Sequence, residues 1–111
     1  MLTNSAPIAS NTQKSDLTEI SAGNGYTAGG TTATTSSSAQ SSGTYKLVLA
    51  DVVFTASGGS IGPFRYAVLY NDTASNDELI GWWDYGSSIT LASGETFTVD
   101  FDATNGVLQV A

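Results

Sequence analysis

The chain has 111 residues, enough for one domain, and it contains no cysteine and no histidine. These absences exclude thiol nucleophiles, disulfide bonds, imidazole acid–base catalysis and the usual zinc sites. Ten acidic residues against three basic ones give a net charge of −7. Nucleic acids and anionic membrane surfaces both require basic patches, so neither is expected as a partner.

The composition also indicates the fold class. Serine and threonine occur 15 times each and glycine 12 times, whereas Glu, Lys and Arg are sparse. This mixture suits short strands joined by turns and excludes a helical bundle. We therefore expect one domain over residues 1–111, all-β, forming an antiparallel β-sandwich or small barrel with long loops rich in Gly, Ser and Thr.

The chain begins with weak signals. Residues 1–16 predict a loop-like lead-in, although Met1–Asn4 is itself strand-like. Leu17, Glu19 and Ile20 suit either a short strand or a single helical turn.

Residues 21–30, SAGNGYTAGG, predict a bending loop, because glycine reaches backbone angles that other residues avoid. Tyr26 within this loop is predicted to plug the core or an interface. Residues 31–44 are a low-complexity Ser/Thr segment that suits either a flexible linker or an edge strand. We favour a strand over residues 31–35 followed by a mobile loop.

Stronger strand signals begin at Tyr45. Residues 45–55, YKLVLADVVFT, predict one long strand with Asp51 at a bulge or rim. Because it is apolar on nearly both faces, we expect this strand to be central and enclosed on both faces. A turn at Ser57–Ser60 and a second strand over residues 64–70 follow. The third strand is predicted over residues 77–85, after a polar turn at residues 71–76.

The last third of the chain predicts a turn at residues 86–88, a short extended piece at residues 89–91, and a further strand at residues 95–101. That strand alternates apolar and polar residues, which is typical of a half-buried strand. Asn105-Gly106 predicts a hairpin turn before a final strand at residues 107–110 that closes the sheet.

Only acids remain as candidates for catalysis or metal binding. Asp100 and Asp102 share a strand face if the strand continues, and Asp77, Glu78 and Asp84 lie around the third strand. Solvated surface acids are the simpler interpretation. The turn at residues 71–77 is rich in Asn and Asp but lacks the spacing of a calcium loop, and Asn71-Asp72-Thr73 is formally a glycosylation acceptor. We expect no catalytic residue, no metal site and no cofactor.

Aromatic residues and the single arginine are the candidates for contacts. Trp82 and Trp83 are adjacent, so on a strand they point to opposite faces, one toward the core and one toward a partner. A sugar-stacking platform is the alternative. Arg65 is predicted to pair with a carboxylate, within the chain or across a subunit boundary. The predicted interface anchors are Tyr26, Phe64, Arg65, Trp82 and Trp83.

Four segments together resemble small structural proteins of tailed-bacteriophage virions. They are SAGNGYTAGG, ADVVFTASGGSIGPFRYAVLYNDT, LIGWWDYG and SGETFTVDFDATNGVLQV, at residues 21–30, 50–73, 79–86 and 93–110. Members of that family carry an upstream segment leading into a first strand, which is missing, truncated or outside the numbering here. The resemblance implies a non-enzymatic virion component, and it supplies no catalytic or metal residues.

The resemblance further implies a location in the phage capsid or tail, with other virion proteins, such as major capsid or tail subunits, as partners. Capsid decoration is favoured over a tail- or fibre-associated role. A homo-oligomer is expected, because symmetric assembly covers exposed strand edges. Two other classes stay open: a carbohydrate-binding β-sandwich module, and a surface or pilus-like subunit whose first residues insert into a neighbouring sheet.

Overall fold

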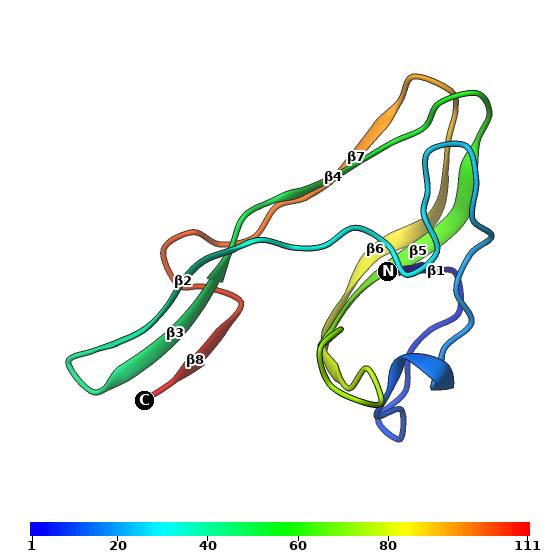
Figure 1. Ribbon diagram of the computed structural model, residues 1–111. Coiled ribbons are helices and arrows are strands. Elements are labelled where there is room, and N and C mark those ends of the chain that lie inside the picture. The colour runs from blue at the N-terminus through cyan, green and yellow to red at the C-terminus, as the bar shows by residue number, and fades with distance from the viewer. The chain divides into compact units, whose positions relative to one another are not determined.

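The computed structural model describes all 111 residues, and its regular structure is almost entirely β (Figure 1). Strands and isolated β-bridges together hold 49% of the residues, and the sheets are antiparallel, which confirms the predicted all-β class. The one helical segment is a single 3-10 turn, η1 (Lys14–Asp16). The chain forms two compact units: the first unit comprises Met1–Gly30 and Thr55–Thr96, and the second unit comprises Thr31–Phe54 and Phe97–Ala111.

The first unit contains a three-stranded sheet in the order β1-β5-β6. Its strands are β1 (Leu2–Thr3), β5 (Ile61–Tyr70) and β6 (Leu79–Leu91). Both pairings are antiparallel, so β5 has a strand on each side and β6 has β5 alone. The predicted strand-like start of the chain is confirmed, because Leu2 and Thr3 lie opposite Ala67 and Tyr66.

The core of the first unit is built on alternate residues of β5. Phe64, Tyr66 and Val68 are buried, while Arg65 and Ala67 between them are only half-buried. This is the period of two that places successive side chains on opposite faces of a strand. Buried residues from both chain segments of the unit complete the core: Met1, Leu2, Thr3, Tyr26, Ala56, Ile61 and Leu91.

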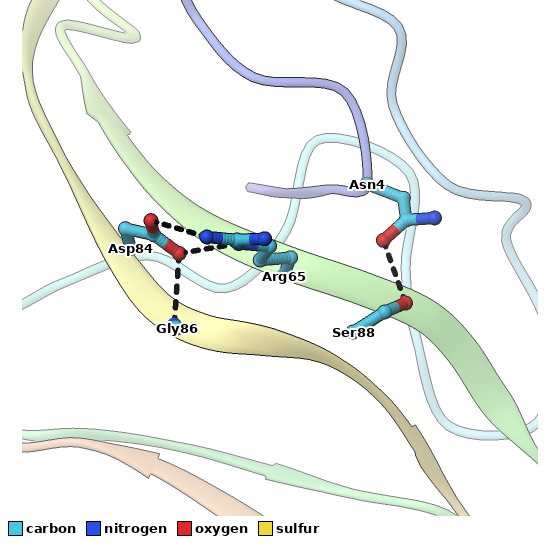
Figure 2. Close-up of polar contacts among 5 residues, drawn as sticks. All are labelled: Asn4, Arg65, Asp84, Gly86 and Ser88. Atoms are coloured by element: carbon cyan, nitrogen blue, oxygen red, sulfur yellow. Dashed lines mark hydrogen bonds and ion pairs between the residues drawn. The ribbon is translucent and has the colours of Figure 1, made fainter.

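Strand β6 continues where the sequence predicts a turn at residues 86–88. Between the pairs Tyr66–Asp84 and Phe64–Ile89, β5 advances by two residues and β6 by five. The extra residues form a large bulge, which lets one strand pass through a turn-like sequence. Gly86 N–H donates to Asp84 within this bulge, and Ser88 Oγ donates to Asn4 at 2.8 Å (Figure 2).

The second unit contains a sheet in the order β2-β3-β8. Its strands are β2 (Thr35–Ser41), β3 (Thr44–Leu49) and β8 (Leu108–Val110). Two further strands, β4 (Val52–Thr55) and β7 (Thr96–Val99), pair with each other. The buried residues of the second unit are Leu49, Val52, Phe54 and Phe101.

The low-complexity segment forms a strand rather than the predicted mobile loop. Residues 31–34 lie outside any strand, and β2 covers Thr35–Ser41 instead. Ser42 and Gly43 both have positive φ, 51° and 83°, as a tight two-residue hairpin turn requires, and this turn places β2 beside β3. Every side chain of β2 is exposed, so backbone pairing rather than burial holds this strand.

The long strand predicted over residues 45–55 divides at Ala50 and Asp51 into β3 and β4. The interruption lies where Asp51 was expected to cause it, and Asp51 Oδ1 accepts a hydrogen bond from Phe101 N–H at 2.9 Å. β3 is central in its sheet, as predicted. Its side chains before Leu49 are only half-buried, so the prediction that it is enclosed on both faces is wrong.

The predicted hairpin at Asn105-Gly106 does not join β7 to β8, because β8 pairs antiparallel with β3. The turn itself is present. Asp102 Oδ1 accepts hydrogen bonds from Thr104 N–H and Asn105 N–H, and Val107 N–H then donates to Leu47 O at 2.8 Å. The backbone bond to Leu47 directs the chain onto β3.

Two glycines of the second unit provide a test of this turn. Gly43 and Gly106 both have positive φ, but a Cβ at Gly106 would lie 2.5 Å from Leu47 O, whereas a Cβ at Gly43 meets nothing within 4 Å. Gly43→Ala should lower the free energy of unfolding by about 1 kcal/mol through backbone strain. Gly106→Ala should cost at least about 1 kcal/mol more, because the clash adds to the strain. Urea unfolding of both variants measures the difference, and equal costs would contradict the close approach.

Candidate interaction surface

Most of the exposed large apolar side chains of the first unit lie on strand β6. Ile80 is 46% exposed, Trp82 45%, Trp83 41% and Tyr85 58%. β6 is also the outer strand of its sheet, so these side chains flank a strand edge. Clusters of exposed apolar residues on a soluble protein mark contact sites. We call the segment from Ile80 to Tyr85 the β6 edge.

The two tryptophans occupy opposite faces of the sheet, as the sequence predicts. Trp82 lies opposite buried Val68, and Trp83 lies opposite Ala67 on the other face. The Trp82 ring meets Tyr66 edge-on, with centroids 5.9 Å apart. Both indoles remain more than two-fifths exposed, so neither is the buried core residue that the sequence predicted for one of them.

Arg65 pairs with Asp84 across the β5–β6 strands (Figure 2). Arg65 Nε donates to Asp84 Oδ1 at 2.7 Å, and its terminal nitrogen donates to Oδ2 at 2.9 Å. The guanidinium also lies 5.5 Å from the centre of the Tyr66 ring. The predicted carboxylate pairing is therefore confirmed, and the partner belongs to the same chain.

This ion pair neutralises the only charged residue of β6. The Arg65 guanidinium, followed by the Gly86 N–H, holds the pKa of the Asp84 carboxyl below its usual value. Arginine binds carboxylates through two parallel hydrogen bonds, which fixes both side chains in one geometry. The β6 edge thus combines exposed aromatic rings with a charge that is already paired.

Tyr26 and Phe64 do not belong to this surface. They are 3% and 0% exposed, so their predicted role as interface anchors is corrected to a role in the core. The Tyr26 hydroxyl accepts from Leu2 N–H at 2.9 Å and donates to Glu19 Oε1 at 2.7 Å. Burial is the main cause that raises the Tyr26 pKa. Tyr26 thereby holds β1 in place, and Glu19 pairs in extended conformation with Thr3.

Ile80 and Tyr85 are surface residues that the sequence analysis did not single out. Both lie at irregular positions of β6. Tyr85 follows Asp84 at the start of the large bulge, and Ile80 is unpaired because the register also shifts between Leu69 and Tyr70. Bulges re-aim side chains in a way that simple alternation cannot anticipate. The only available signal was that Ile80 and Trp82 are two residues apart, which places both on one face of a regular strand.

Some of the acidic residues stabilise turns. Asp102 accepts three hydrogen bonds from Thr104 and Asn105, and Asn105 N–H is the first cause that lowers its pKa. β7 ends at Val99, so Asp100 and Asp102 do not share a strand face as predicted. No group of three or more acids, histidines or cysteines is placed to hold a metal ion. The one helical segment lacks the length and apolarity that a membrane span needs.

The second unit has an open hollow of about 940 Å³. Polar side chains from β2, β3, β8 and the adjoining turns line most of it, among them Ser37, Lys46, Asp51, Asp100, Asn105 and Gln109. Lys46 Nζ donates to Thr104 O at 3.2 Å at this site. Hydroxyl, amide and carboxylate groups here offer hydrogen bonds to a polar ligand but form no nucleophile–base pair.

Comparisons with protein-family models, with curated proteins and with solved structures give no match for this chain. The interpretation of the β6 edge therefore depends on its own geometry and on the sequence resemblance described above.

Removing the Tyr26 hydroxyl tests its part in holding β1. Tyr26→Phe should lower the free energy of unfolding by about 1–3 kcal/mol, because Leu2 N–H and the Glu19 carboxylate lose a buried partner. The matched control is Tyr45→Phe, whose hydroxyl bonds Ser38 at an exposed site and which should cost less than about 0.5 kcal/mol. Chemical denaturation measures both values, and a silent Tyr26→Phe would contradict the role.

The ion pair predicts a specific pH dependence. Because the folded pKa of Asp84 lies below its unfolded value, the stabilisation is complete above about pH 4 and is lost as the pH falls through the folded pKa. Arg65→Gln should raise the Asp84 pKa toward its ordinary value, measured by carboxyl NMR titration. Asp102 serves as the internal control, since its lowered pKa should not move. An unchanged pKa of Asp84 would show that the Gly86 N–H alone lowers the pKa of this carboxyl.

Proposed function

We propose that this chain is a non-enzymatic structural protein of a tailed-phage virion, and that it decorates the capsid by binding other virion subunits. The observation that carries the proposal is the β6 edge, where large apolar side chains are exposed around one ion-paired acid. Aromatic residues and arginine are enriched in protein interfaces, whereas unpaired charges are depleted at their centres. Arg65, Trp82 and Trp83 are the proposed contact residues.

The resemblance to phage virion proteins supports the same role. One of its segments, LIGWWDYG at residues 79–86, coincides with the β6 edge, and another contains β5. A protein used in many copies benefits from contacts made by strands, because backbone edges and apolar faces need no deep pocket. The net charge of −7 supports solubility before assembly.

Binding to purified virion parts tests the proposal. The full chain is mixed with emptied, expanded capsids of the phage that encodes it and, separately, with its tails, and co-sedimentation measures binding. We expect saturable binding to capsids that Trp83→Ala weakens by at least about tenfold, the size of an interface hot spot. Leu108→Ala, at a side chain of similar exposure on β8, is the matched control and should bind normally.

Each outcome of this experiment has a defined meaning. Binding to tails alone would replace capsid decoration by the tail-associated role. Absence of binding to both particles would contradict a virion function.

A carbohydrate-binding module is the second candidate, favoured by the polar hollow of the second unit. Hydroxyl and amide groups such as those of Ser37, Asn105 and Gln109 suit the hydroxyls of a sugar. Glycan-array binding accompanied by NMR shifts at these residues would support this candidate. An array without signal would exclude this candidate and leave assembly as the remaining proposal.

A further inference from the structure

Backbone contacts cover the outer side of β6 where the strand begins. Leu79 N–H donates to Thr12 O at 2.9 Å, and Gln13 forms an isolated bridge with Glu78. Past this point the sheet has no further strand on that side, since its order ends with β6. The N–H and C=O groups along such an edge are a template on which another strand can pair.

This edge lacks the features with which proteins usually prevent edge pairing. Lysine, proline and unpaired charges commonly protect outer strands. Leu79–Leu91 contains no Lys, Arg or Pro, and its single charged residue, Asp84, is bound by Arg65 at 2.7 Å. In a chain with a net charge of −7, the β6 edge is therefore a stretch along which two copies meet little like-charge repulsion.

We propose that a second copy of this chain occupies this edge, paired antiparallel through β6 of both copies about a two-fold axis. The inference rests on the proposed function, because it names one partner for the same surface. An antiparallel pair of identical strands is self-complementary, so one edge supplies both halves of the contact.

The order of side chains along the edge suits a two-fold axis at Trp83. In that register, Gly81 of one copy lies opposite Tyr85 of the other, and an aromatic ring covers a glycine without a clash. Trp82 of one copy then lies opposite Asp84 of the other, beside the Arg65 guanidinium that Asp84 holds. Indole rings attract guanidinium groups, so Trp82 of one copy would contact the Arg65–Asp84 ion pair of the other.

Concentration-dependent measurements on the full chain test this pairing. Sedimentation equilibrium from about 5 µM to about 500 µM covers the range of weak protein dimers. We expect a monomer–dimer equilibrium. Hydrogen exchange should show the amides of residues 80–85 that face away from β5 more protected in the concentrated sample than after dilution. This second measurement needs no variant, so it stands even if a substitution disturbs folding.

A matched pair of variants locates the contact. Ile80→Asp introduces a carboxylate into the β6 edge and should raise the dimer Kd by at least about tenfold. Val110→Asp makes the same change at an exposed side chain of β8 and should leave the Kd unchanged. The pairing is overturned if the wild-type chain stays monomeric throughout, if Ile80→Asp dimerises like wild type, or if exchange protection falls on β8 instead.

Capsid binding separates this inference from the proposed function. A chain that dimerises through β6 but does not bind capsids or tails would support the pairing and contradict the virion role. A chain that binds capsids while remaining monomeric at every concentration would support the virion role and overturn the pairing.

Discussion

The antiparallel pairing of β5 with β6 is the interaction on which the first unit depends. β5 receives β1 on one side and β6 on the other, so its buried residues Phe64, Tyr66 and Val68 lie at the centre of the sheet. β6 has a strand on one side only. The same pairing that encloses β5 therefore leaves the β6 edge exposed, and the candidate function follows from this asymmetry.

Irregular register between β5 and β6 decides which side chains the β6 edge exposes. A regular β6 would alternate its side chains strictly between two faces. The register shifts between Leu69 and Tyr70 and between Phe64 and Tyr66 let Ile80 and Tyr85 leave this pattern. The bulge is held by polar contacts, in which Asp84 binds both Arg65 and the Gly86 N–H while Ser88 binds Asn4 (Figure 2). Aromatic exposure and charge neutralisation thus have one structural origin.

Three of the other acidic side chains accept hydrogen bonds from backbone N–H groups at turns or at a strand break. Asp16 accepts hydrogen bonds from the Thr12 and Gln13 amides before η1, and the Thr12 bond is the first cause that lowers its pKa. Asp102 organises the turn before β8, and Asp51 receives Phe101 N–H at the break between β3 and β4. Short carboxylate side chains suit the positions of Asp16 and Asp102 because they reach backbone N–H groups two to four residues away.

The sequence by itself determined the all-β class, the strand that became β5, the opposite faces of Trp82 and Trp83, and a carboxylate partner for Arg65. These depend on composition and on the period of two, which are local properties. It could not place β2, because Ser and Thr carry no hydrophobic pattern and this strand is held by backbone pairing with β3. It also could not tell that β8 joins β3 rather than β7, or that Phe64 is enclosed while Trp83 is exposed. Those outcomes were decided by the tertiary structure, since strand neighbours and burial depend on residues far apart in the chain.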